Sequence, residues 1–264
     1  MQESPYRVAV CFSGGVRNFK DTFSSFNENF LKVYQPDIFI YGKQNNDGVE
    51  ANLADITNLY SPKSIIINDD AFYAKEEFKH SFGAPTLKSL FFNIHQCNRL
   101  KHEYEVSSNF IYDIVLRARL DCFFTRVVDV EELSQATDNV ILTRHDWFGF
   151  KQSHPTRECD IFAIGKSAAM DRYSNAFLSK DLFNDSHTSD CAETLLGLHL
   201  VREGITTNNI GEVKGQLGGA PLVLDYPDSF NIDQFTTYRG PGWRQHLRIR
   251  NDSGPDANWR GLEY

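Results

Sequence analysis

The sequence predicts an α/β protein in which a mostly parallel central sheet is flanked by helices. An apolar run, VAVCF at residues 8–12, ends at Ser-Gly-Gly, which is typical of a strand covered on both faces. Strand and helix patterns then alternate as βαβαβ up to residue 69, an order that favours parallel strands joined by crossover helices. With 264 residues the chain is long enough for one large domain of this class.

The first half of the chain contains five further elements. After the first strand, aromatic residues recur at helical spacing until Pro36, which ends that helix. Two short strands follow at 37–42 and 64–69, with a helix between them. The strongest helical pattern spans 85–105 and begins at a proline.

The second half begins with segment 112–124, whose first part reads as a strand. The later elements are strands at 139–147 and 160–165 and helices over 167–177 and 190–204. No internal repeat or low-complexity linker is present, so we expect one domain over residues 1–245 and a polar C-terminal tail over 246–264.

Composition excludes several classes of protein. The net charge of −8 argues against binding to nucleic acid or to an anionic membrane surface, because both need a basic face. No stretch has the length of a membrane-spanning helix, and the opening MQESPY lacks a signal pattern. The cysteines are odd in number, scattered and without Cys-x-x-Cys spacing, which predicts a reduced, cytoplasmic protein without a structural zinc site. They are Cys11, Cys97, Cys122, Cys159 and Cys191.

The Ser-Gly-Gly segment is the first candidate site. Gly14 and Gly15 can adopt backbone angles closed to other residues and allow a ligand to approach the main chain, although a plain strand-to-helix connection is an equal alternative. The ATP-pyrophosphatase loop reads Ser-Gly-Gly-x-Asp-Ser, but here Arg17 stands at the Asp position and Asn18 at the following Ser position. A cation in place of a magnesium-binding acid reverses the local electrostatics and disfavours that interpretation.

The second candidate is RARLD. In a strand, Arg117, Arg119 and Asp121 share one face at the carboxyl end, where ligands bind in open α/β sheets. Two guanidinium groups there can hold a diphosphate, and the carboxylate can take a divalent cation or a ribose hydroxyl. The alternative is a surface charge ladder in which the acid neutralises the arginines.

Two other segments have weaker signals. TRHDWFG at 143–149 is either a floor for a sugar ring or an edge loop that covers the core. Glu193 lies near the start of an apolar-faced helix and is either a helix-terminal carboxylate or a group that points into a pocket as a general base.

Taken in order, six segments resemble GT-A-type glycosyltransferases from a group of bacterial and viral capsular or lipopolysaccharide (WavE-like) sugar transferases. The segments are VAVCFSGGVRNF, PDIFIYG, SLFFNIHQCNRL, YDIVLRARLDCFF, DIFAIGKSAAMDRYS and AETLLGLHLVREGI. Their order and spacing carry the resemblance, and its most specific parts are Ser-Gly-x-x-Arg, Tyr-Asp-x-Val-x-x-x-Arg-x-Asp and Asp-x-Phe-Ala-Ile-Gly.

The resemblance implies a GT-A-like fold with a Rossmann-like half and a nucleotide-sugar pocket over the first strand. Ser13, Gly14 and Arg17 would contact the nucleotide, and Asp121 would be the acid next to the diphosphate or its metal. Asp160 and Glu193 would face the acceptor. In the usual motif the residue two before Asp121 is also an aspartate.

Arg119 stands at that position here, which leaves metal use open. A single carboxylate binds Mn²⁺ or Mg²⁺ weakly unless diphosphate oxygens and waters complete the shell. In a metal-independent enzyme, Arg117 and Arg119 would stabilise the leaving group instead.

The sequence therefore predicts a glycosyltransferase with a nucleotide-diphosphate sugar donor and a glycan or glycoconjugate acceptor. Two alternatives stay open at this point: an ATP-pyrophosphatase-like adenylating enzyme, and a catalytically silent protein that binds a nucleotide sugar.

Overall fold

A computed structural model describes most of the chain up to residue 223. The described residues are 5–16, 18–44, 53–73, 75, 85–124, 126–143, 158–184, 192–210 and 222–223. All of them belong to one compact unit, Met1–Leu224, so the expected boundary at 245/246 lies outside the described residues. None of the helices in these ranges is both long and apolar enough to cross a membrane.

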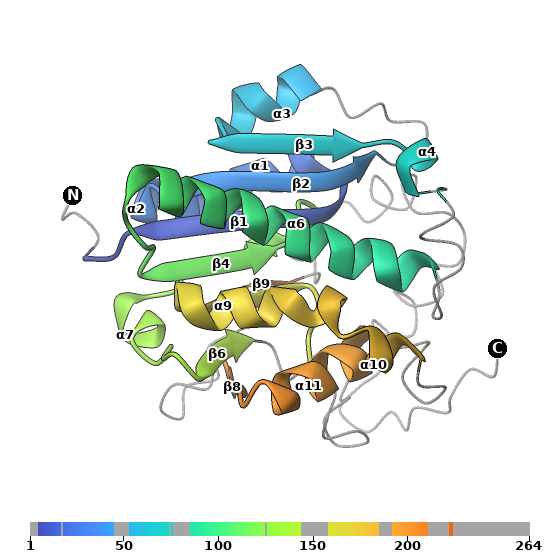
Figure 1. The fold of residues 1–264 in the computed structure, drawn as a ribbon. Coiled ribbons are helices and arrows are strands. Elements are labelled where there is room, and N and C mark those ends of the chain that lie inside the picture. Colours follow the sequence, from blue (N-terminus) through green and yellow to red (C-terminus); the bar gives the residue numbers. More distant parts are fainter. Residues whose placement is uncertain are drawn as a thin grey trace, which may run out of the picture. The chain divides into compact units, whose positions relative to one another are not determined.

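The centre of the fold is a seven-stranded mixed sheet, which confirms the predicted α/β class. Its spatial order is β3-β2-β1-β4-β7-β6-β8 (Figure 1). These strands are β1 (Val8–Val16), β2 (Asp37–Gln44), β3 (Ser64–Asn68), β4 (Ile114–Ala118), β6 (Val140–Thr143), β7 (Phe162–Gly165) and β8 (Thr206–Asn209). A separate two-stranded pair joins β5 (Phe123–Phe124) to β9 (Leu222–Val223).

The order of the strands reverses at β1. The chain moves outward from β1 to β2 and β3 through parallel pairings, and then returns to pair β4 with the other side of β1, again in parallel. The next neighbour, β7, is antiparallel to both β4 and β6. In open α/β sheets, a crevice for ligands forms at the carboxyl ends of the strands where the order reverses.

Two hydrophobic layers cover the sheet. Val8, Val10 and Phe12 of β1 face a core formed with α1 (Phe19–Phe26) and α3 (Leu53–Tyr60). The alternate residues, Ala9 and Cys11, face a second core. Its helices are α6 (Pro85–Ser108), α9 (Ser167–Ser174), α10 (Lys180–Asn184) and α11 (Ala192–Arg202). Figure 1 shows α6 and α9 lying across the sheet on this second face.

Shorter segments connect these layers. After α1 the chain continues through a π-helical turn, η1 (Asn27–Leu31), into α2 (Lys32–Tyr34), so the helix predicted to run to Pro36 is interrupted. The others are α4 (Asp70–Tyr73), α7 (Val130–Leu133) and the 3-10 turn η3 (Asn175–Leu178). The described cysteines are buried and form no disulfide; they are Cys11, Cys97, Cys122 and Cys159.

Two strand boundaries differ from the sequence prediction, and both shape the site. β1 does not turn at the glycine pair but continues to Val16, because β2 pairs with it as far as Gln44. β4 ends at Ala118, and a turn in which Cys122 N donates to Arg119 O (3.2 Å) follows it. Because β4 pairs with β1 only as far as Phe12, the two strands separate beyond that residue.

His199 connects the helices behind this opening. Its ring is 1% exposed on α11, with Nε2 2.8 Å from Arg172 O of α9 and Nδ1 2.9 Å from Ser179 Oγ. The carbonyl only accepts, so Nε2 carries the hydrogen and Nδ1 accepts from the serine hydroxyl. Burial lowers the pKa of His199, and the neutral ring therefore fixes α11 to α9.

We expect this histidine to make folding sensitive to acid. Its lowered pKa means that the unfolded chain takes up a proton below about pH 6.5 while the native ring resists it, so the free energy of unfolding falls as the pH falls. His199→Leu should cost about 1–3 kcal/mol at neutral pH, since two buried partners lose a hydrogen bond. It should also reduce the fall in the free energy of unfolding between neutral and acidic pH, as measured by urea unfolding at two pH values. If that free energy falls equally in wild type and variant on acidification, the prediction is wrong. The variant should still lose some stability in acid, because burial also lowers the pKa of His95.

Candidate functional site

The candidate site lies where β1 and β4 separate. Ser13, Gly14 and Gly15 lie on β1 beyond its last pairing with β4, and we call this edge of β1 the glycine margin. Ser13 is buried. Gly14 has a φ of +118°, which L side chains rarely adopt, and a Cβ there would lie 3.7 Å from Arg119 Cγ. That distance is an ordinary van der Waals contact, so the backbone angle, and not a lack of space beside Arg119, is what favours glycine at position 14. Arg17 lies outside the described residues.

Arg117 is the buried centre of the site. It is 2% exposed, and its Nε donates to Ser13 Oγ at 3.2 Å, while Nη1 donates to the carbonyl of Asp160. Its Nη2 is buried without a hydrogen-bond partner among the described residues. The guanidinium thus joins the ends of β1 and β4 to the residues that precede β7, and it keeps one donor unused.

Arg119 and Asp121 form a two-bonded ion pair in the turn after β4. Arg119 Nε donates to Oδ1 at 2.8 Å, and Nη2 donates to Oδ2. Burial lowers the pKa of Arg119, but the charge and hydrogen bonds of Asp121 outweigh it, so the guanidinium is held in its charged form. Asp121 is 2% exposed and both its oxygens face Arg119. A divalent cation does not fit this carboxylate as it stands, since Arg119 occupies the place of the ion.

Asp160 and Glu193 bring two carboxylates to the same site. Asp160 precedes β7, and Glu193 lies in the first turn of α11, where its carbonyl accepts a hydrogen bond from Glu158 N at 3.0 Å. Burial raises the pKa of Asp160, and the charge of Glu193 raises it further, against the opposing effect of Arg117 and Arg119. A carboxylate whose pKa is moved toward neutrality is suited to accept a proton as a general base.

Tyr173 is a site residue that sequence reasoning missed. It lies on α9 and is 1% exposed, and its hydroxyl is buried with no hydrogen-bond partner in the described ranges. Burial raises its pKa strongly, while the charge of Arg117 acts in the opposite direction. In the sequence Tyr173 belongs to an apolar helical stripe with Met170 and cannot be distinguished there from an ordinary core residue.

The structure therefore brings most of the sequence-predicted site together. Those that gather are Ser13, Gly14, Gly15, Arg117, Arg119, Asp121, Asp160 and Glu193. Of the aromatic segment 143–149, only Thr143 is described; it is buried, and its hydroxyl donates to Phe162 O at 2.9 Å. The rest of that segment lies outside the described residues.

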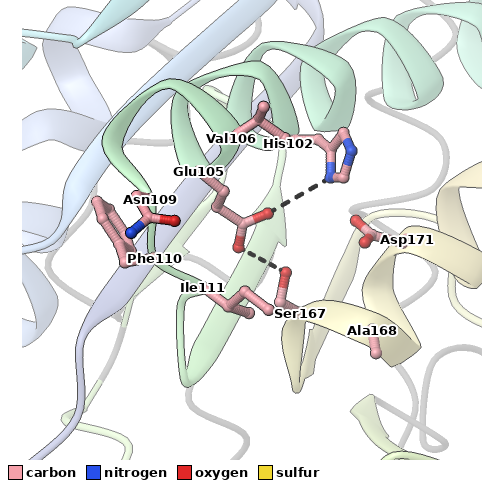
Figure 2. A pocket seen from close by; sticks show the side chains of 9 residues that line it. All are labelled: His102, Glu105, Val106, Asn109, Phe110, Ile111, Ser167, Ala168 and Asp171. Carbon is pink, nitrogen blue, oxygen red and sulfur yellow. Dashed lines mark hydrogen bonds and ion pairs between the residues drawn. The ribbon is translucent and has the colours of Figure 1, made fainter.

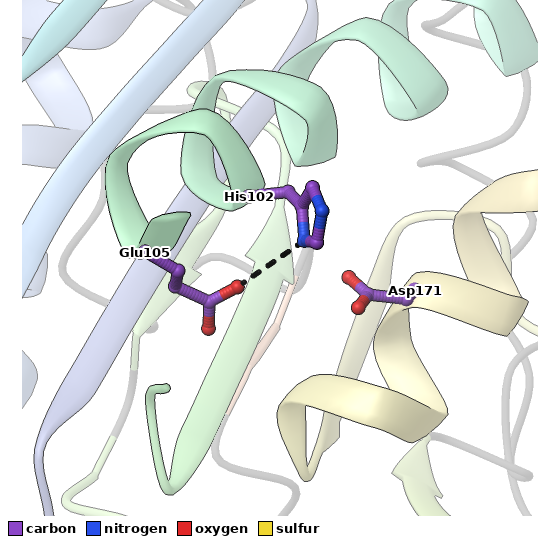
Figure 3. A group of neighbouring side chains, drawn as sticks. All are labelled: His102, Glu105 and Asp171. Carbon is purple, nitrogen blue, oxygen red and sulfur yellow. Dashed lines mark ion pairs between the residues drawn. The ribbon is translucent and has the colours of Figure 1, made fainter. Parts of the chain in front are cut away.

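A second polar cluster lies at the opposite, amino-terminal end of β4. A cavity of about 680 Å³ opens between the end of α6 and the start of α9. Figure 2 shows His102 and Asp171 facing each other across it. With Glu105 they form a group whose ligand atoms all lie within 4.8 Å, residue types that could hold a metal ion (Figure 3).

Lys101 already bridges the two carboxylates of this second cluster. It is 0% exposed, and its Nζ lies 2.7 Å from Asp171 Oδ1 and 3.0 Å from Glu105 Oε2, with a further hydrogen bond to Ser167 Oγ. All three ammonium hydrogens are thereby used. A divalent cation would meet the repulsion of this buried charge, so the cluster is stable as a structural ion network.

The comparisons with known proteins give a family and a distant structural likeness. The model of a domain of unknown function (DUF7796) matches residues 3–152. No curated protein matches the sequence. Among solved structures, the apo form of mouse xyloside xylosyltransferase 1 is similar with a TM-score of 0.42 and 11% identity, over 77% of this chain and 84% of that one.

A likeness of that size does not bear on the activity of this chain. Neither finding involves the bacterial and viral capsular or lipopolysaccharide transferases that the sequence resembles, so that resemblance stays a prediction.

The ion pair after β4 yields a stability prediction. Asp121→Asn should lower the free energy of unfolding by about 2–4 kcal/mol, because it leaves Arg119 charged and poorly paired. Adding Arg119→Met should recover part of that loss in urea unfolding, since the unpaired charge is then removed. Glu103→Gln, which breaks the exposed pair with Arg99, should change stability little and serves as the control. An Asp121→Asn protein as stable as wild type would show that the pair does not stabilise the fold.

Proposed function

The chain belongs to the DUF7796 family of domains of unknown function, and we propose from its site that it is a glycosyltransferase. The donor would be a nucleotide-diphosphate sugar, and the acceptor a hydroxyl of a glycan or glycoconjugate. This proposal also draws on the ordered segments in which the sequence resembles GT-A-type transferases.

The observation that carries the proposal is the buried Arg117 with its unused Nη2. A buried cationic donor without a partner is costly, and an anionic ligand is the natural complement. Arg119 supplies a second guanidinium, and its side chain lies next to Gly14 in the glycine margin of β1. Two guanidiniums at a strand-order reversal suit a diphosphate, whose several oxygens can accept hydrogen bonds from more than one side chain.

The roles in transfer follow from these charges. An acceptor hydroxyl oxygen bonds to the anomeric carbon as the bond from that carbon to the diphosphate oxygen breaks, with both bonding electrons leaving on the diphosphate. Arg117 and Arg119 stabilise the negative charge of the departing diphosphate. The hydroxyl proton passes to a carboxylate, for which Asp160 is the candidate because of its raised pKa.

A donor-hydrolysis assay tests the proposal. We expect the wild type to hydrolyse or transfer from at least one UDP- or GDP-sugar in a panel measured with and without Mn²⁺. Arg117→Met should lower kcat/KM by about 10²–10³, the usual loss when a transition-state donor is removed. Arg99→Met, at the exposed pair on α6, should leave the rate unchanged.

The other outcomes identify the alternatives. Donor binding without any turnover would indicate a silent binding protein. Binding of ATP together with pyrophosphate release would indicate an adenylating enzyme. Either result would overturn the proposed reaction.

The acid limb of the pH–rate profile tests the assignment of the base. Glu193→Gln removes a negative charge that raises the pKa of Asp160, so that pKa should fall. If Asp160 accepts the proton, the variant stays active and its acid limb moves to lower pH. Asp160→Asn should lose activity. A Glu193→Gln variant that loses activity at every pH would make Glu193 the base instead.

A further inference from the structure

Two buried donors in the site have no acceptor. Arg117 Nη2 and the hydroxyl of Tyr173 are both buried, and neither forms a hydrogen bond within the part of the chain that the structure describes. Their residues are 2% and 1% exposed. Leaving such a group unpaired is unfavourable, more so when it is charged, so two of them in one site require an explanation.

The topology places these two groups at the same level on one face of the sheet. β7 is antiparallel to β4 and pairs Gly165 with Val115, so α9, which follows β7, runs in the direction of β4. From Ser167 to Tyr173 the helix advances about 9 Å, close to the roughly 10 Å that β4 covers from Ile114 to Arg117.

Side-chain direction agrees with this placement. Tyr173 packs in the same core as Val115, which shares its face of β4 with Arg117. The charges of Arg117 and Asp160 both act on the Tyr173 hydroxyl, as expected for close neighbours.

The chemistry of the pair selects an acceptor oxygen with negative charge. The guanidinium can only donate. The phenol stays protonated because its pKa is raised by burial, so it too has a hydrogen to give. One oxygen with two lone pairs can accept from both, and an anionic oxygen also compensates the charge of Arg117.

We propose that Tyr173 is a donor-binding residue, whose hydroxyl and Arg117 Nη2 together hold one diphosphate oxygen of the nucleotide sugar. The inference rests on the proposed function and adds to it a residue from α9, on the far side of β4 from the glycine margin. The oxygen enters beside Arg119, whose side chain is 18% exposed and is therefore in contact with solvent.

Tyr173→Phe tests the inference with calorimetric titration of UDP, GDP and inorganic pyrophosphate. The substitution deletes only the hydroxyl, so the unliganded variant should unfold at the same temperature as wild type or higher, because an unpaired buried group is removed. Affinity for the nucleoside diphosphate that wild type binds should fall about ten-fold or more, the usual effect of losing a hydrogen bond to a charged group.

Tyr112→Phe is the matched control. The Tyr112 hydroxyl donates to Asp37 Oδ2 at 2.6 Å at the opposite end of the sheet, and the residue is 2% exposed. Its loss should lower the unfolding temperature and leave affinity unchanged. The two variants therefore separate a binding role from a structural one.

Each other outcome has a distinct meaning. If wild type and Tyr173→Phe bind equally while Arg117→Met binds weakly, the inference about Tyr173 is wrong and the proposed function stands. If Tyr173→Phe lowers the unfolding temperature without changing affinity, the hydroxyl has a structural partner and the inference is again wrong. If wild type binds none of the three probes, both proposals fail.

Discussion

The site depends on one physical constraint, the burial of the Arg117 guanidinium where three strands meet. A buried charge must be compensated by hydrogen bonds or opposite charge, and Arg117 obtains this from Ser13 of β1, the carbonyl of Asp160 before β7, and nearby carboxylates. The separation of β1 and β4 beyond Phe12 provides the space for it. Because the compensating groups come from different elements, the ends of these strands are fixed relative to one another by a single side chain.

The carboxylates of the site lie in two different electrostatic environments. Asp121 is matched by its own guanidinium, Arg119, and acts as the partner of a stable ion pair. Burial and the like charge of Glu193 raise the pKa of Asp160, against the opposing effect of Arg117 and Arg119. Environments that differ in this way are how proteins give chemically equal acids different roles. Under the proposed function, these environments suit Asp160 to accept a proton and Asp121 to balance the charge of Arg119.

The sequence predicts the fold further than it predicts the site. Apolar runs and helical stripes identify the strands and the long helix α6, because those patterns follow directly from burial. The sequence does not show that β7 is antiparallel to its neighbours β4 and β6, because the apolar pattern of a buried strand is the same in either direction. Spacing places Arg117 at the carboxyl end of β4, but it cannot show that Arg119 turns to pair with Asp121, which depends on where β4 ends. Tyr173 is hidden for a related reason, because an aromatic ring on an apolar stripe does not reveal whether its hydroxyl has a partner.

The two ends of β4 offer an internal comparison that bears on function. At the amino-terminal end, Lys101 is as deeply buried as Arg117, yet its three hydrogens all reach acceptors in Ser167, Asp171 and Glu105. The fold can therefore satisfy a buried cation completely where the role is structural. At the carboxyl end, the same sheet leaves Arg117 Nη2 without an acceptor and sets a second unpaired donor on α9 near it. Among the described residues Lys88 Nζ is also buried without a hydrogen-bond partner, so an unpaired donor does not by itself mark a ligand site. What favours an anionic ligand at the strand-order reversal is that two guanidiniums, those of Arg117 and Arg119, accompany the unpaired donors there.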